Sequence, residues 1–137
     1  MLAAALLLWG LEGSVPAAQS VASVIRDCWK GRDHAAMSAC VEARAREARE
    51  NLRNAEMDAR QAIQASTDEP GSPKYRSDAL AALSHASSAF EEYVDKQCHF
   101  EATLASKGNG AEDVRWACIA VLSEERTQRM NSSRPVP

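Results

Sequence analysis

The chain has 137 residues, enough for a single domain, and carries a net charge of −3 with an isoelectric point of about 5.6. This balance argues against a nucleic-acid partner, which requires a clustered basic surface, and is compatible with a cationic protein partner. Aromatic residues make up only 5% of the sequence, which allows a thin helical core rather than a thick one. The many long charged side chains and few β-branched runs predict an all-α fold.

The N-terminal segment LAAALLLWGLEGSVPAAQ begins with an apolar run that is too short to span a membrane. The tripeptide VPA at 15–17 fits the small-x-small pattern before a cleavage site, so we interpret residues 1–17 as a signal peptide cut after Ala17 or Ala18. No Lys or Arg precedes the run, which is unusual for a signal peptide, and the alternative is a buried N-terminal helix. The protein is therefore expected to be periplasmic or secreted, without a stable membrane span after cleavage.

A short helix or turn is expected around Cys28, because Gly31 interrupts the segment RDCWKGRDHAAM. Asp33 suits the N-cap of a long helix that continues to about Ser66 without glycine or proline.

The apolar positions of this first long helix alternate in steps of four and three, which is a heptad stripe. They are Val41, Ala45, Ala48, Leu52, Ala55, Ala59 and Ala62. Charged residues between them predict a solvated face, with favourable pairs at Glu42–Arg46 and Glu56–Arg60. The alanines would let a partner helix approach closely.

The segment STDEPGSP at 66–73 predicts a turn or short loop. A second long helix is expected from Lys74 or Ser77 to Leu104, antiparallel to the first. Its expected apolar stripe is Leu80, Leu83, Ala86 or Ser87, Phe90, Tyr93 or Val94, and Gln97.

The segment SKGNGAED then predicts a connector to a shorter third helix. Glu112 and Asp113 suit the first turn of that helix, which is expected to end near Met130. Residues 131–137 are expected to form a disordered tail.

Four cysteines are present, at Cys28, Cys40, Cys98 and Cys118. An even number in a small exported chain indicates a disulfide framework, and four cysteines allow three pairings. Pairing near neighbours, Cys28 with Cys40 and Cys98 with Cys118, is the simplest. Each such bond would stabilise the fold by about 3 kcal/mol.

No pattern in the sequence favours catalysis or metal binding. Cys28, His34 and Cys40 lack a fourth ligand. Cys98 and His99 are adjacent on a helix, so their side chains diverge by about 100° and cannot form a nucleophile–base pair. We therefore predict that the protein is not an enzyme and has no cofactor or metal.

The aromatic residues are assigned to packing. Phe90, Tyr93 and Trp116 are expected between the second and third long helices, and Trp29 is expected to cover the first disulfide. The alternative is an exposed aromatic patch for a partner.

From Leu83 to Met130 the sequence resembles the lysozyme-inhibitor LprI-like family of small, exported, helical bacterial proteins. The residues that carry the resemblance are Phe90, Tyr93, Asp95, Cys98, the GNG connector, Cys118, Leu122, Ser123, Arg126 and Met130. The segment DCWKGRDHAAMSACVEA is similar to the short Cys-to-Cys element that precedes the family's first long helix. The resemblance implies an LprI-like helical domain over residues 18–130.

The sequence departs from the family pattern in several places. The family usually has Trp, Arg and Thr where this chain has Phe90, Val94 and Ser123. The family's Leu-Asn-x-x-Tyr is represented only by Leu52-Arg53. Val94 is expected to remove a polar contact between helices, and the missing Tyr to thin the core.

The resemblance implies an inhibitor that blocks the cleft of lysozyme-type muramidases, with the loops at 66–75 and 105–113 as the expected contacts. The alternative is a non-enzymatic module for protein interaction in the cell envelope, without lysozyme inhibition. The alanine-rich heptad stripe would then serve self-association as well as the core within the chain.

Overall fold

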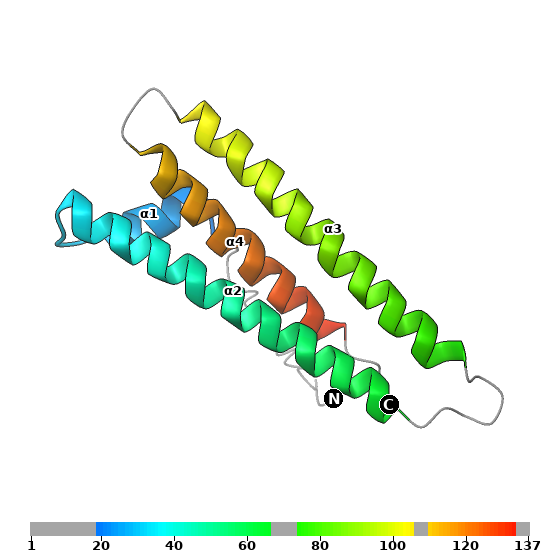
Figure 1. The fold of residues 1–137 in the computed structure, drawn as a ribbon. Helices are drawn as coiled ribbons and strands as arrows, with labels where there is room; N and C mark the ends of the chain where they lie inside the picture. The colour runs from blue at the N-terminus through cyan, green and yellow to red at the C-terminus, as the bar shows by residue number, and fades with distance from the viewer. Residues whose placement is uncertain (1–18, 67–73, 106–109, 134–137) are drawn as a thin grey trace, which may run out of the picture.

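The computed structural model describes residues 19–66, 74–105 and 110–133, and these residues form four helices and no strand (Figure 1). The helices are α1 (Val21–Trp29), α2 (His34–Ala65), α3 (Lys74–Leu104) and α4 (Ala111–Ser132). The predicted all-α class is confirmed, whereas the predicted count of three is one helix short. The element expected around Cys28 is a complete helix of nine residues.

Local capping signals set several helix ends. The Asp33 side chain accepts a hydrogen bond from the Ala36 N–H at 2.8 Å, so it caps α2 as expected. Ser20 and Ser23 form a capping box at α1. Helix α4 continues to Ser132, which makes the start of the predicted tail helical, while residues 134–137 lie outside the described residues.

Helix α4 lies between α2 and α3 (Figure 1), and α3 runs antiparallel to both. The two long helices are thus antiparallel, as expected, but the shorter helix separates them along most of their length. The reason lies in the sequence of α4, where five consecutive residues, 117–121, are buried. Five residues turn through more than a full circle, so all sides of this segment must be covered by other helices.

The heptad stripe of α2 packs inside the bundle. Its first five members, Val41, Ala45, Ala48, Leu52 and Ala55, are buried, whereas Ala59 is half-buried and Ala62 is exposed. Ala45 and Ala48 share a core cluster with residues of α3 and α4. Because these alanines face other helices of the same chain, the proposed use of this stripe for self-association is wrong.

Both disulfides join near neighbours, Cys28 to Cys40 and Cys98 to Cys118, with Cα–Cα distances of 5.6 and 5.5 Å. The first bond ties α1 to α2, and the second ties the last turns of α3 to the first turns of α4. Both therefore lie at the same end of the bundle. The opposite end holds an open cavity of about 600 Å³ between α2, the start of α3 and the end of α4.

Of the two alternatives for the apolar stripe of α3, Tyr93 or Val94, the structure places Val94 in the core. Tyr93 is 51% exposed, so the expectation that it packs between helices is wrong. Val94 is 3% exposed and belongs to the core cluster, where an apolar residue suits its surroundings. Phe90 and Trp116 are partly buried against the same cluster, as expected.

None of the helices in the described part of the chain combines the length and apolar character that crossing a membrane would need.

Candidate functional site

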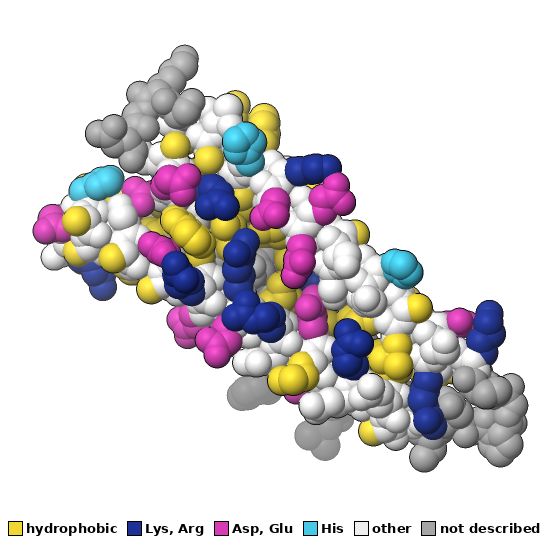
Figure 2. Space-filling model, viewed as in Figure 1, with side chains coloured by type: hydrophobic (Ala, Val, Ile, Leu, Met, Phe, Trp, Pro, Cys, Tyr) yellow, Lys and Arg dark blue, Asp and Glu magenta, His cyan; other side chains and the backbone are white. Residues whose placement is uncertain are grey.

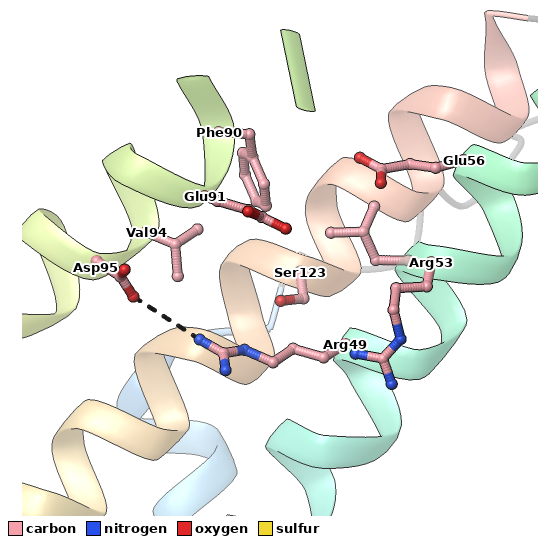
Figure 3. A pocket seen from close by; sticks show the side chains of 9 residues that line it. Arg49, Arg53, Glu56, Phe90, Glu91, Val94, Asp95 and Ser123 are labelled. Carbon is pink, nitrogen blue, oxygen red and sulfur yellow. Dashed lines mark ion pairs between the residues drawn. The ribbon is translucent and has the colours of Figure 1, made fainter. Parts of the chain in front are cut away.

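A groove of about 300 Å³ runs between α2 and α3, with α4 beneath it (Figure 3). Leu52, Phe90 and Val94 supply apolar walls, and Ser123 of α4 lies at its base. The groove exists because α4 holds the two long helices apart. Figure 2 shows hydrophobic side chains along the middle of this face, with basic and acidic groups beside them.

The rim of the groove on α3 is acidic, whereas the rim on α2 carries both signs. Glu91 and Asp95 come from α3, and Arg49, Arg53 and Glu56 come from α2. Arg49 reaches across the groove to Asp95, with an N–O distance of 3.9 Å. Both side chains are substantially exposed, so this pair contributes little to stability.

A second polar cluster joins three helices and is more protected from solvent. The Arg126 Nε of α4 donates to Glu56 of α2 at 3.2 Å, and the Ser87 hydroxyl of α3 donates to the same carboxylate oxygen at 2.7 Å. The Arg126 guanidinium also lies 4.8 Å from the centre of the Phe90 ring. A hydrogen-bonded ion pair of this kind depends on both charges being present.

Arg126→Ala is expected to lower the free energy of unfolding by roughly 1–3 kcal/mol, because Glu56 would keep its charge in a partly buried place without its partner. Arg126→Lys should recover only part of this loss, since Lys lacks the planar group that stacks on Phe90. Urea unfolding measures both values. Arg60→Ala, on the exposed face of α2, is the matched control, and an equal loss in that variant would contradict the assignment.

Six of the residues that carry the resemblance were expected to have structural roles besides the cysteines, and four of these six gather at the groove. The six are Phe90, Tyr93, Asp95, Leu122, Ser123 and Arg126. Phe90, Asp95 and Ser123 line the groove, and Arg126 contacts Phe90 beside it. Leu122 packs against the core cluster, whereas Tyr93 lies outside on the exposed side of α3.

The sequence did not reveal the partners of these motif residues. Glu56 was assigned to a surface pair with Arg60, but it pairs with Arg126, 70 residues away. In contrast, the predicted Glu42–Arg46 pair is present, with a 3.0 Å hydrogen bond from the arginine Nε. An acidic residue beside the buried stripe of α2 and two arginines near the end of α4, Arg126 and Arg129, were the available signals.

The turn between α1 and α2, which we define as residues 29–34, stands at the disulfide-bonded end of the bundle (Figure 1). Gly31 has φ = 68°, which lets the chain reverse direction here. The Arg32 N–H donates to the Trp29 carbonyl at 3.2 Å and closes the turn.

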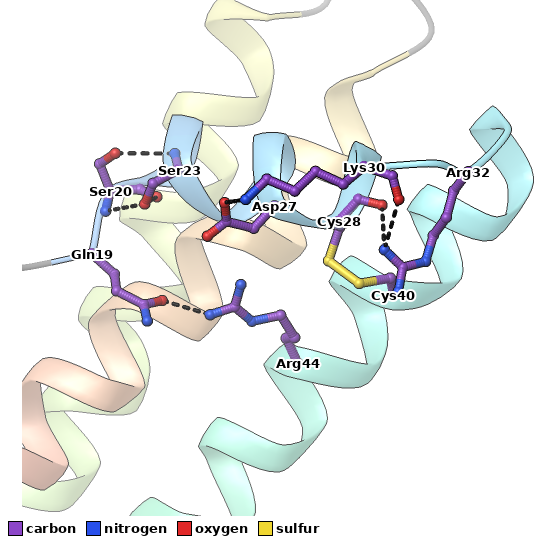
Figure 4. Close-up of polar contacts among 9 residues, drawn as sticks. All are labelled: Gln19, Ser20, Ser23, Asp27, Cys28, Lys30, Arg32, Cys40 and Arg44. Atoms are coloured by element: carbon purple, nitrogen blue, oxygen red, sulfur yellow. Dashed lines mark hydrogen bonds and ion pairs between the residues drawn. A yellow bond between two sulfur atoms is a disulfide. The ribbon is translucent and has the colours of Figure 1, made fainter.

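The α1–α2 turn is held from within (Figure 4). Arg32 folds back and donates from one terminal nitrogen to the carbonyls of Cys28 at 3.1 Å and Lys30 at 3.5 Å. The disulfide from Cys28 to Cys40 fixes the end of α1 against α2. This bonding leaves the turn few alternative conformations.

The side chains of the α1–α2 turn face solvent. Trp29, which was assigned to covering the first disulfide, is 49% exposed, and its ring meets His34 edge-on at 6.0 Å. Lys30 is also exposed and lies 3.1 Å from Asp27, and this contact lowers the pKa of the Asp27 carboxyl. His34 approaches the buried Asp113 of α4 at 3.4 Å. The result is a firmly held, projecting surface with an aromatic ring and charges of both signs, since Asp27 and Asp33 lie close to Lys30 and Arg32.

Glu124 of α4 should make stability depend on pH. Its partial burial raises the pKa of its carboxyl, against a lowering by Arg44. A raised pKa in the folded state means that folding loses stability as pH rises from the unfolded pKa through the folded one. We expect Glu124→Gln to stabilise the protein slightly near neutral pH and not at acidic pH, as measured by urea unfolding. Glu125→Gln, at the exposed neighbouring position, is the control. A gain of the same size at both pH values would contradict this cause.

No group of three or more His, Cys, Asp or Glu side chains within residues 19–66, 74–105 and 110–133 is placed to hold a metal ion. The mixed-charge groove and the projecting α1–α2 turn are two surfaces of the described residues that a partner could contact.

No curated protein and no solved structure matches this sequence. The family model described as lysozyme inhibitor LprI matches residues 28–130, well over half of the chain. The matched region begins at the first cysteine and contains both disulfides, the α1–α2 turn and the groove. The chain therefore belongs to the lysozyme inhibitor LprI family.

Proposed function

We propose that this protein is exported and inhibits a lysozyme-type muramidase by blocking the substrate cleft of that enzyme. The observation that carries the proposal is the family match over residues 28–130. A fold alone does not determine function, so the proposal also needs a surface suited to the task.

The α1–α2 turn is the described surface that best fits an enzyme cleft. Glycoside hydrolases that cleave sugar chains carry a pair of carboxyl groups in a cleft. A projecting element with Trp29, Lys30 and Arg32 offers both shape and charge to such a cleft. The groove between α2 and α3 is itself concave, so it fits a cleft poorly. Because the turn is already held in place, little freedom is lost on binding.

The loops first predicted as contacts, 66–75 and 105–113, lie largely outside the described residues. Their part in binding stays a prediction. The signal peptide at 1–17 also lies outside the described residues. Export is supported by the two disulfides, because such bonds form and persist in oxidising compartments.

Measuring the turnover of hen-type and bacterial lysozymes with excess purified, oxidised protein tests the proposal. We expect dose-dependent inhibition of at least one class, and weaker inhibition after the disulfides are reduced. Unchanged rates against both classes would refute it.

A second candidate function is a protein-interaction module in the cell envelope without lysozyme inhibition. The observation that favours it is an exposed apolar face on α3, which is assigned below to a second copy of this chain. Unchanged lysozyme rates, together with self-association of the purified protein through this face, would favour this function over inhibition.

A further inference from the structure

One side of α3 presents an apolar face that no other helix of the described chain covers. Its large members are Tyr93, Phe100 and Leu104, which are 51%, 54% and 67% exposed. Ala82, Ala86 and Ala89 are also exposed. With Gln97, these seven residues fall within a sector of about 80° on a helix of 3.6 residues per turn, so they form one continuous stripe. We call them the α3 stripe.

The spacing of the α3 stripe is the same in both directions from its middle. From Ala82 to Leu104 the steps are 4, 3, 4, 4, 3 and 4 residues, so Tyr93 is the central position. A helix packed antiparallel across a two-fold axis at Tyr93 would therefore place stripe positions opposite stripe positions along the whole length. Such a self-complementary patch is what a symmetric dimer requires.

The sizes of the side chains complement each other under this symmetry. The N-terminal half of the stripe contains only alanine, whereas the C-terminal half contains Gln97, Phe100 and Leu104. The two-fold relation brings Ala86 opposite Phe100, and Ala82 opposite Leu104. Each large side chain would thus meet a small one, which is how close-packed helix interfaces avoid both gaps and clashes.

Charges beside the stripe also agree with this pairing. Glu92 and Lys96 form an ion pair on α3, and this contact lowers the pKa of the Glu92 carboxyl. In the antiparallel arrangement the two copies of this pair lie on the same side of the interface. Glu92 of one copy is offset by about 3 Å along the axis from both Lys96 and Glu92 of the other, at 1.5 Å per residue. Lys96 lies about 40° nearer to the midline of the stripe than Glu92 does, so the opposite charges approach each other more closely than the two Glu92 carboxylates.

We propose that two copies of this chain associate through their α3 stripes, antiparallel and with the two-fold axis at Tyr93. The interface does not depend on lysozyme inhibition. It also replaces the heptad stripe of α2, which is buried within the bundle, as the surface for self-association.

Sedimentation of the full mature chain at high micromolar concentration tests whether the dimer forms. We expect a dimer for the wild type and a monomer for Ala86→Phe, because two large side chains would then meet. Adding Phe100→Ala to Ala86→Phe exchanges the two sizes and should restore the dimer. A monomeric wild type, or a dimer unaffected by Ala86→Phe, would overturn the proposal.

Oxidative cross-linking tests the position of the axis. Residues on a two-fold axis face their own copies, so Tyr93→Cys should yield a covalent dimer under mild oxidation. Ser88→Cys, which is exposed on α3 but outside the stripe, should give much less. Equal cross-linking of both variants, or none at Tyr93→Cys, would also overturn the proposal. All the altered side chains are at the surface, so each variant should keep its helices. Circular dichroism of each variant checks this.

Discussion

Replacing Trp29 with alanine is expected to weaken the inhibition of a lysozyme by about 30-fold or more, while the urea midpoint stays nearly unchanged. An exposed Trp at the centre of an interface commonly contributes about 2 kcal/mol or more to binding, which corresponds to this factor. The side chain is half exposed in the free protein and its ring meets only the edge of His34 among the described aromatic rings. Its removal should therefore affect the complex far more than the fold.

The matched control is Tyr75→Ala. Tyr75 is 46% exposed, close to the value for Trp29, but lies at the opposite end of the bundle. Inhibition constants for both variants, measured against the lysozyme that the wild type inhibits best, decide the outcome. An unchanged inhibition constant for Trp29→Ala would exclude the α1–α2 turn from the contact. It would not bear on whether the protein inhibits lysozyme, which the assay of the wild type tests separately.

Replacing both Cys98 and Cys118 with alanine is expected to lower the free energy of unfolding by about 3 kcal/mol, because the unfolded chain loses the constraint of a 20-residue closure. Alanine is preferred to serine, since both sulfur atoms are buried and a hydroxyl there would lack partners. Urea unfolding with a constant slope measures the loss.

The matching variant removes Cys28 and Cys40 and opens a closure of 12 residues, for which the chain-entropy estimate is slightly smaller. This variant should lose inhibition in addition to stability, because its bond holds the α1–α2 turn. The Cys98–Cys118 variant should keep most of its inhibition while folded. The reverse order of effects on inhibition would show that the turn is not the contacting element.

Features set by neighbouring residues could be predicted from the sequence. Asp33 before a long stretch without glycine or proline predicted the start of α2, and the breakers after Ala65 and Leu104 predicted the ends of two helices. The simplest disulfide pairing is the one present, because short closures join elements that are also adjacent in space.

Features set by packing between distant segments could not be predicted. Tyr93 and Val94 are one residue apart, which turns the side chain by about 100°, and either could have faced the core. Helix α4 packs against the side of α3 that carries Val94, and this packing buries Val94 rather than Tyr93. The pairing of Glu56 with Arg126 likewise depends on which side of α2 receives α4, and the local Arg60 was an equally plausible partner.

The contact segments predicted from the sequence, 66–75 and 105–113, lie largely outside the described residues and stay a prediction. They were predicted as contacts because the disulfides and the helix packing were expected to hold the rest of the chain. The exposure of Trp29 could not be predicted, because this residue adjoins a half-cystine and aromatic residues in such places commonly cover the bond. Only the exposed area of the ring distinguishes the two roles.

The placement of both disulfides at one end of the bundle has a consequence for how the molecule opens. Amide hydrogens near Cys28 and Cys118 should exchange only through the largest openings, whereas those near Ala62 and Met130, beside the cavity, should exchange through small local ones. Protection of the amide hydrogens from exchange would then decrease along α2 and α4, from the disulfide-bonded end to the end beside the cavity. Proteases should attack the unbraced end first, so that nicked molecules still carry an intact α1–α2 turn.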